Sequence, residues 1–298
     1  MYFYCKSGNM FVMCHNCNVS TTFGKFLEFM DASQYKEYAF ESYADKGFAK
    51  KQSVIPVVLE TEKPFNRFKN ISDFKDNIGM LPDGHYAKEY IRNRKIPQEF
   101  WSEIFFVEHY ASWLNENFPD HGKKNLVDDA RIVMFYTDQN GGITNVSGRA
   151  LQNSDKLLRY ITVKIRDEKK VFGLHRLDPH KQVYIVEGQF DSMFLPNAVA
   201  SGDANLIGTA TYVTLLYPTA EITLVYDNQP RNRDIVRQME LAIADGWDTA
   251  FLPYDSEAKD INEMVKSGMT PEQVKKLIDD HRCGGLTAHM ELSKWRKC

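Results

Sequence analysis

The sequence lacks any apolar run that approaches the roughly 20 residues needed to cross a bilayer as a helix. Residues 1–5 also lack the basic, apolar and small-residue order of a signal peptide. These two absences predict a protein that stays in the cytoplasm where it is made. The sequence has no internal repeat and no low-complexity tract either, so we expect no repeat architecture.

Cysteine is scarce, with five in 298 residues. An odd, unevenly spread set in a cytosolic chain argues against a disulfide framework. Only Cys14 and Cys17, which two residues separate, have an informative spacing; the others are Cys5, Cys283 and Cys298.

An excess of charge of either sign is also missing, because the net charge is −3. Phosphate binding depends on where lysines and arginines cluster, and an acidic site can lie beside a local basic groove. Net charge therefore neither supports nor excludes a nucleic-acid partner. The length allows a large core and two or three domains.

The amino-terminal third divides into three stretches. Residues 1 to about 30 are aromatic and contain three cysteines, and apolar residues at helical spacing predict one or two helices within 23–48. From about residue 45 to 83, the many lysines and the prolines Pro56, Pro64 and Pro82 predict a linker.

The remaining sequence alternates between helical and strand-like periodicity. Helices are predicted over Tyr86–Ile91, from Pro97 onward with Trp101, Ile104 and Phe105 as the apolar stripe, over 191–200 and over 233–244. Strands are predicted over 131–136 and 143–150, as a hairpin around the turn 138–142, and over 183–186 and 222–226. The last two are continuous apolar runs, which suit strands buried on both faces of a parallel sheet. The expected fold is α/β, and α+β overall, with a βαβ parallel sheet.

Each of these two buried strands ends in acid. Glu187 follows the first strand, with Asp191 four residues beyond, and Asp227 follows the second. The carboxyl ends of parallel strands share one edge of the sheet, where ligands bind. We therefore expect these carboxylates to meet, and such hard oxygen ligands suit magnesium or manganese. Gly188 permits a tight turn after Glu187.

Acids at strand ends often serve only as helix caps or solvated turns. Here two such strands occur together, and Asp260 and Glu263 follow them. This pairing favours a metal site that orients a nucleoside triphosphate for in-line phosphoryl transfer.

The motifs around these acids resemble the Toprim domain of bacterial-type primases. The matching stretches are Val186–Ser192, Gly208–Ala210 and the strand that ends at Asp227. The resemblance implies that Glu187 and Asp227 bind the metal and that Asp191 is a nearby acid. Gln229 occupies the place of the family's third acid. Lys259 and Asp260, with Asn262 and Glu263, resemble the acidic segment that closes the domain.

The resemblance extends over nearly the whole chain from Cys14 onward, and is strongest to primases of T-even-type phages. Residues 148–151, 159–161 and 172–174 resemble the basic subdomain that precedes Toprim, and Tyr90–Pro97 resembles a helix pair of the same proteins. Residues 227–231 and 285–294 resemble the phage proteins in particular. The implied domains are a partial zinc ribbon with its following helix (1–45), a linker (46–82), the basic primase subdomain (83–178), the Toprim domain (179–262) and a helical tail (263–298) that Thr270-Pro271 opens.

The activity that the resemblance implies is the synthesis of short RNA primers on single-stranded DNA at a phage replication fork. Glu187 and Asp227 would hold magnesium, and Glu187 would assist proton transfer from the attacking 3′-hydroxyl. Arg149 and Arg159 would bind template or triphosphate. The other expected nucleotide- or template-binding residues are Arg231, Arg233, Lys259 and Asp260. The implied partners are single-stranded DNA, ribonucleoside triphosphates and a hexameric replicative helicase, in the cytoplasm of an infected bacterium.

The sequence departs from the family pattern at two places. Gln229 is neutral, so we expect one metal to bind more weakly than in the family. Cys14 and Cys17 resemble only the second knuckle of the family's zinc ribbon. Cys5 and His15 are candidate substitutes for the missing ligands, although His15 is poorly placed beside Cys14. A structural zinc site has four ligands, so zinc is expected only if the ribbon is completed.

Other functions remain alternatives. A type IA topoisomerase needs a longer chain, an OLD-type nuclease needs an ATPase P-loop, which is absent, and a small Toprim recombination factor lacks the upstream region. A non-catalytic accessory that binds single-stranded DNA and helicase would explain Gln229 and the half zinc ribbon. The presence of Glu187, Asp191 and Asp227 argues against that alternative.

Overall fold

The computed structural model describes residues 2–6, 9–13, 20–23, 70–121, 126–152, 157–253 and 258–298. The chain divides into two compact units, Met1–Lys63 and Pro64–Cys298. In the first unit, β1 (Tyr2–Lys6), β2 (Asn9–Met13) and β3 (Ser20–Thr22) form an antiparallel sheet. Val12 is buried in it. Cys14, His15 and Cys17, the predicted helices within 23–48 and most of the predicted linker lie outside the described residues.

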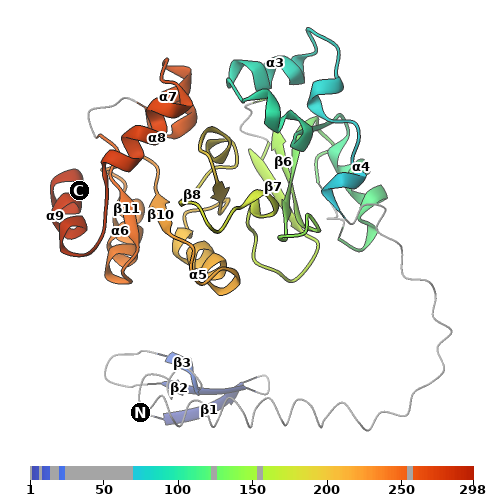
Figure 1. Ribbon diagram of the computed structural model, residues 1–298. Coiled ribbons are helices and arrows are strands. Elements are labelled where there is room, and N and C mark those ends of the chain that lie inside the picture. Colours follow the sequence, from blue (N-terminus) through green and yellow to red (C-terminus); the bar gives the residue numbers. More distant parts are fainter. Residues whose placement is uncertain are drawn as a thin grey trace. The chain divides into compact units, whose positions relative to one another are not determined.

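The second unit contains an antiparallel sheet of four strands in the order β4-β5-β6-β7. Figure 1 labels β6 and β7 of this sheet. Its strands are β4 (Phe105–Val107), β5 (Arg131–Thr137), β6 (Ile143–Ala150) and β7 (Tyr160–Lys164). The predicted hairpin of β5 and β6 is confirmed. Its turn is fixed by Asp138, whose Oδ1 accepts hydrogen bonds from the backbone N–H groups of Asn140 and Gly142, both at 2.8 Å.

Helices cover this sheet, and we call the sheet with its helices the antiparallel lobe. They are α3 (Tyr86–Asn93), α4 (Tyr110–Asn117) and the 3-10 helices Ile71–Asp73, Ile78–Met80, Gln98–Glu103 and Pro119–His121. The helix predicted from Pro97 to about Phe118 is wrong as one element, because β4 separates the 3-10 helix Gln98–Glu103 from α4. Phe105 belongs to β4, where it pairs with Val133 of β5.

The second lobe, which we call the parallel lobe, is built on a five-stranded sheet in the order β12-β11-β10-β8-β9. Its strands are β8 (Val183–Val186), β9 (Ala198–Ala200), β10 (Ile222–Val225), β11 (Asp248–Ala250) and β12 (Arg282–Cys283). All neighbours are parallel except β11 and β12. The predicted parallel pairing of the two apolar runs is thus confirmed, and every residue of β8 and β10 is buried. The fold is mixed α/β.

The helices of this parallel lobe are α5 (Leu206–Leu216), α6 (Arg233–Ala244), α7 (Ile261–Lys266), α8 (Pro271–Asp280), α9 (Gly285–Trp295) and two 3-10 helices, Leu174–Arg176 and Asp191–Phe194. The predicted helix 233–244 is confirmed. The predicted helix 191–200 is wrong. It ends at Phe194, since Pro196 has no N–H to continue a helix, and the chain then pairs as β9 with β8.

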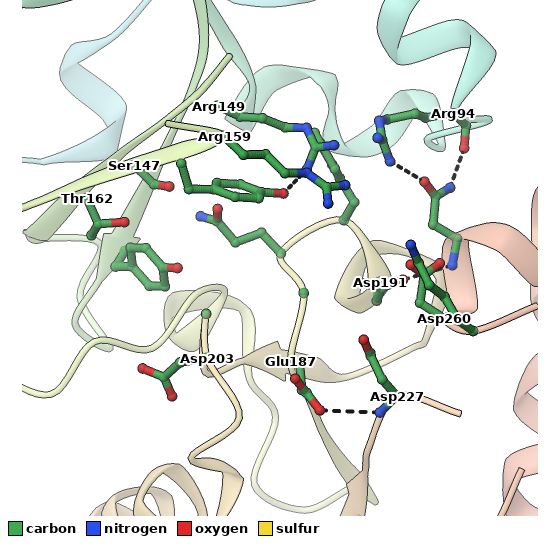
Figure 2. Close-up of a pocket in the computed structure, with 18 of the residues that line it drawn as sticks. Arg94, Ser147, Arg149, Arg159, Thr162, Glu187, Asp191, Asp203, Asp227 and Asp260 are labelled. Atoms are coloured by element: carbon green, nitrogen blue, oxygen red, sulfur yellow. Dashed lines mark hydrogen bonds between the residues drawn. The ribbon is translucent and has the colours of Figure 1, made fainter. Parts of the chain in front are cut away.

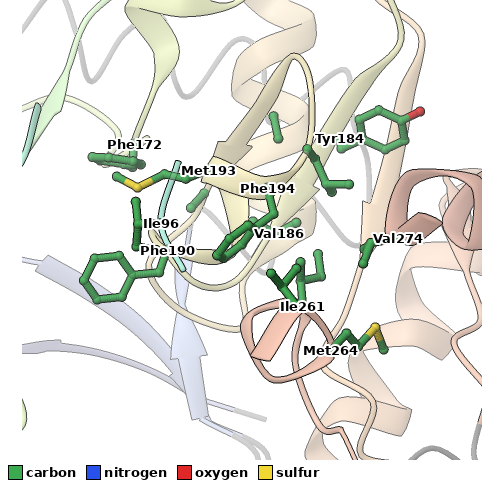
Figure 3. Close-up of a cluster of buried hydrophobic side chains, with 14 of the residues drawn as sticks. Ile96, Phe172, Tyr184, Val186, Phe190, Met193, Phe194, Ile261, Met264 and Val274 are labelled. Atoms are coloured by element: carbon green, nitrogen blue, oxygen red, sulfur yellow. The ribbon is translucent and has the colours of Figure 1, made fainter. Parts of the chain in front are cut away.

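One hydrophobic core joins the two lobes. Ile96, three residues beyond the end of α3, is buried with Phe190 and Phe194 of the parallel lobe. Figure 3 shows Ile96 beside Phe190, and Val186 close to Ile261 of α7. Because apolar side chains from both lobes share this cluster, the lobes pack as one body.

The segment predicted as the end of the linker and the predicted tail both contribute to the folded unit. Within residues 70–82, the Ile78 N–H donates to the Ile104 carbonyl at 2.7 Å. The tail supplies β12 to the sheet, and the Trp295 Nε1–H donates to the Leu252 carbonyl at 2.8 Å. Thr270 caps α8 as the sequence predicts. Across the described ranges, no helix is long and apolar enough to cross a membrane.

Candidate active site

Glu187 and Asp227 meet at one edge of the five-stranded sheet, because their strands β8 and β10 are parallel neighbours. Val186 is registered with Val225, so the residues that follow each strand come together. The Asp227 N–H donates to Glu187 Oε1 at 3.3 Å (Figure 2). The structure thus brings together two acids that lie 40 positions apart in the sequence.

Asp191 reaches the same edge through the turn that starts at Gly188. A Cβ on Gly188 would lie 2.0 Å from Asp191 Oδ2, so only glycine leaves room for this carboxylate. The other oxygen, Asp191 Oδ1, accepts a hydrogen bond from the Asn262 N–H at 2.8 Å. Glycine is needed here for close approach.

Burial disfavours the charged forms of these acids. Burial, followed by the neighbouring Glu187 carboxylate, raises the pKa of Asp227 to about 8. Burial, followed by the Asp260 carboxylate, raises the pKa of Asp191 to about 7. Burial also raises the pKa of Glu187. We call these four acids the acid wall. Their charges would be relieved by a bound cation.

The donor chemistry of the acid wall fits a divalent cation, although its carboxylates point in different directions. Among the residues described, no three His, Cys, Asp or Glu side chains already stand in the arrangement of metal ligands. Asp260 Oδ1 caps α7 by accepting from the Glu263 N–H at 2.8 Å. Gln229 lines the cavity: its Nε2 donates to Asp227 Oδ2 at 3.3 Å, and its Oε1 accepts from Asn232 Nδ2 at 2.9 Å.

Facing the acids, strands of the antiparallel lobe present arginine and hydroxyl side chains. Arg149 of β6 is buried, and its Nε donates to the Tyr90 hydroxyl at 2.5 Å. The same guanidinium donates to the Tyr160 hydroxyl and lies 5.5 Å from the Phe190 ring centre. Arg159 is exposed, with its guanidinium 6.0 Å from the Tyr160 ring. The predicted pair of arginines therefore faces the acids.

The two walls enclose a cavity of about 350 Å³. In Figure 2, Arg149 and Arg159 reach into it from one side, and Glu187 and Asp227 lie on the other. Its lining comprises Arg94, Tyr136, Ser147, Arg149, Arg159, Tyr160, Thr162, Glu187, Gly188, Gln189, Phe190, Asp191, Gly202, Asp203, Asp227, Gln229, Lys259, Asp260 and Asn262.

Sequence reasoning gave no role to Arg94 and Asn262, which join the two lobes at this cavity. Arg94 Nη1 donates to Asn262 Oδ1 at 2.5 Å, and Asn262 Nδ2 donates back to the Arg94 carbonyl at 2.7 Å. Lys95, with φ of 57°, extends the contact by donating from Nζ to the Val265 carbonyl at 3.0 Å. Because Asn262 also binds Asp191, this contact supports the acid wall directly.

The other predicted residues have different places. Lys259 lines the cavity and pairs with Glu263 at 3.3 Å. Arg231 and Arg233 are exposed, and the described lining of the cavity does not include them. Asp203, which the sequence did not single out, lines the cavity and raises the pKa of Glu187 after burial does.

Comparisons with known proteins agree with this architecture. No family model matches the chain. The chain is 29% identical over 296 residues to the DNA primase of Enterobacteria phage T4, covering 96% of this chain and 82% of the relative.

Two solved structures are similar in fold. One is the Aquifex aeolicus primase, with its zinc-binding and RNA polymerase domains (TM-score 0.56, 20% identity, 99% of this chain and 85% of that one). The other is the catalytic domain of the DnaG primase bound to single-stranded DNA (TM-score 0.52, 18% identity, 73% of this chain and 80% of that one). At these identities the likeness concerns the fold.

The antiparallel sheet and the mostly parallel five-stranded sheet of this chain match the fold of the solved Aquifex aeolicus primase. In sequence, the chain is a homologue of the phage T4 DNA primase along 96% of its own length and 82% of the length of that relative.

Proposed function

We propose that this protein is a DNA primase that synthesises short RNA primers on single-stranded DNA by metal-dependent nucleotidyl transfer. One observation carries the proposal: partly buried acids face two arginines, the buried Arg149 and the exposed Arg159, across one cavity. Phosphoryl transfer needs both a site for cations and fixed positive groups for phosphates. The homology to the phage T4 primase supports the same activity.

The finer domain assignment belongs to this proposal. We assign the five-stranded sheet with its acid wall to a Toprim domain and the antiparallel lobe to the basic primase subdomain. The amino-terminal unit would be the remnant of a zinc ribbon, to which Cys14 and Cys17 would contribute two ligands. Zinc would bind only if other ligands complete the tetrahedron.

Glu187 and Asp227 would hold magnesium or manganese, with Asp191 beside them. Their buried carboxylates, whose pKa values are raised, fit this role because a cation would stabilise the ionised forms. When bound, the cation would orient the triphosphate and stabilise the charge that develops in phosphoryl transfer. Gln229 would contribute a neutral oxygen where the family has a charge.

The chain's own side chains would perform the remaining steps. Glu187 would accept the proton of the attacking 3′-hydroxyl, because its carboxylate lies at the cavity beside the proposed metal position. Arg159, exposed at the cavity, would bind template or triphosphate oxygens through its planar guanidinium. Arg149 is held by the Tyr90 and Tyr160 hydroxyls, so its charge would stay fixed toward the cavity.

We further propose single-stranded DNA, ribonucleoside triphosphates and a hexameric helicase as partners. A solved DnaG catalytic domain binds single-stranded DNA. In this chain, the template would lie against the arginines, with Lys259 and Asp260 at the nucleotide. Arg231 and Arg233 would make contacts outside the cavity.

The direct test is primer synthesis on single-stranded DNA with labelled ribonucleotides, with and without the helicase. We expect short ribonucleotide products from the wild type and loss of these products in Glu187→Gln. Glu221→Gln is the matched control, because Glu221 is exposed at the opposite end of β10. Absence of products under every metal condition, with DNA binding intact, would contradict the proposal and favour a non-catalytic accessory.

A further inference from the structure

The side chains that β6 and β7 of the antiparallel lobe contribute to the cavity form a wall that changes from charged to neutral along the strands. Strand alternation places Ser147 and Arg149 of β6 on the same face. The register sets Thr162 of β7 opposite Ser147, and Tyr160 opposite Arg149. All four line the cavity. Along this wall, the charged end at Arg149 gives way, after two residues, to neutral hydroxyls (Figure 2).

Two buried polar groups that line the cavity have no hydrogen-bond partner among the residues described. Ser147 is fully buried, and its Oγ has no hydrogen-bond partner among the residues described. Gln189 is 4% exposed, and its Nε2 likewise has none. Buried polar groups are nearly always hydrogen-bonded, because an unpaired one destabilises the fold. Since both residues line the cavity, a ligand that enters it can supply the missing partners.

We propose that Ser147 and Gln189 form a neutral subsite that binds the ribose of the nucleotide. The inference rests on the proposed function and specifies which part of the substrate this wall contacts. A ribose hydroxyl both donates and accepts, so it can satisfy the Gln189 donor and the Ser147 hydroxyl together. A phosphate would instead be expected at the charged end of the wall, near Arg149.

The position of the subsite relative to the acids supports this assignment. Gln189 follows Glu187 by two residues, and Ser147 precedes Arg149 by two, a separation of roughly 7 Å along a strand. The ribose of a nucleotide is the neutral group attached directly to its phosphates. The cavity has phosphate-binding groups and, two residues away along the chain, unpaired neutral groups. This order matches that of the phosphates and the sugar in a nucleotide.

The subsite predicts discrimination between ribose and deoxyribose. A nucleotide that lacks the 2′-hydroxyl would leave a buried polar group unpaired, and sites built to bind a hydroxyl reject analogues without it. We expect wild-type protein to bind ATP more tightly than 2′-deoxy-ATP in magnesium. In Ser147→Ala and in Gln189→Met, the ATP dissociation constant should rise about tenfold while that of 2′-deoxy-ATP changes little.

Thr144→Val is the matched control. Thr144 also lies on β6, and its buried hydroxyl likewise has no partner within the described part of the chain, but it is on the face turned away from the cavity. All three substitutions remove an unpaired buried group, so thermal unfolding should show no loss of stability in any of them. Only the two cavity variants should lose ATP affinity.

Equal weakening for ATP and 2′-deoxy-ATP, or no weakening in either cavity variant, would overturn the subsite. Primer synthesis is measured in parallel on the same variants. A wild type that discriminates between the nucleotides but makes no primers would refute the proposed function and leave the subsite standing. Active primer synthesis with unchanged discrimination in both variants would refute the subsite alone.

Discussion

The Asp227 side chain lowers the stability of the folded protein when no cation is bound to the acid wall. The side chain sits among other acids in a partly buried position, and its pKa is raised to about 8. Without a cation, the folded protein must either keep a proton on this group or hold a charge against its neighbours. The acid wall therefore destabilises the empty protein.

Asp227→Asn should stabilise the metal-free protein by roughly 2 kcal/mol at pH 8.5, because it removes a repelled, buried charge. Urea unfolding in EDTA measures the change. In excess magnesium the order should reverse, since only the wild type gains stability from the ion. Glu221→Gln should leave both values nearly unchanged, and a destabilised Asp227→Asn in EDTA would contradict this account.

Gln229→Glu should lower the magnesium concentration needed for half-maximal primer synthesis. The new carboxylate would replace an amide that now donates to Asp227 Oδ2, adding a charged oxygen to the site. The same change should lower stability in EDTA, because two carboxylates would then repel each other. An unchanged magnesium titration would show that Gln229 does not limit metal binding.

The sequence predicted the acids and Arg149 of the cavity because each follows from a pattern: a buried strand and its end, or a family motif. Ser147 carries no such pattern, and Arg94 and Asn262 belong to family-like motifs that gave them no role of their own. Their partners come from distant parts of the chain, and Arg94 and Asn262 are 168 positions apart. A polar residue's role depends on what packs against it, which local periodicity does not report.

At the scale of elements, α7 connects the lobes. Its first turn holds Asp191 through the Asn262 N–H, while the Asn262 side chain exchanges two hydrogen bonds with Arg94 at the end of α3. A single residue thus fixes both an acid and the opposite lobe.

Arg94 and Asn262 should be energetically coupled by about 1 to 2 kcal/mol in a double-mutant cycle. Urea unfolding of Arg94→Ala, Asn262→Ala and the double variant measures this coupling energy. Lys276→Ala with Asn262→Ala serves as an uncoupled pair, since Lys276 is an exposed residue of α8 that pairs with Asp280. Additive effects in the Arg94 cycle would show that the contact contributes nothing to stability.

The prediction of helices and strands succeeded where one pattern of apolar residues was clear in the sequence. The β8 and β10 runs are continuous and apolar, and α6 has a clear helical stripe. It failed at β9, where Ala198–Ala200 is too short to show a period and follows apolar residues at helical spacing. The helix α5 went unpredicted because its residues are apolar on nearly every side. Burial in the folded protein, rather than the local sequence pattern, determines the secondary structure of these two segments.

For the whole molecule, the raised pKa values predict a pH dependence of stability. Asp191 and Asp227 bind protons more tightly in the folded than in the unfolded state, where their pKa values are near 3.8. Stability should therefore fall in EDTA as pH rises from about 4 to about 8, and level off above.

Thermal unfolding between pH 4 and 9, in EDTA and in magnesium, measures this dependence. Magnesium binds the ionised carboxylates, so its stabilising effect should grow over the same interval. In Asp227→Asn the decline in EDTA should be smaller. A metal-free protein that becomes more stable between pH 5 and pH 8 would contradict the raised pKa values.

The short antiparallel strand β12 has a consequence for handling the protein. It covers the outer edge of β11, where unpaired N–H and C=O groups would otherwise recruit strands from other molecules. A fragment that ends at Asp280 would expose this edge together with the apolar surface that α9 now covers. Such a fragment should retain the acids and arginines of the cavity and yet aggregate, so solubility rather than chemistry sets the carboxyl-terminal limit for shortened versions.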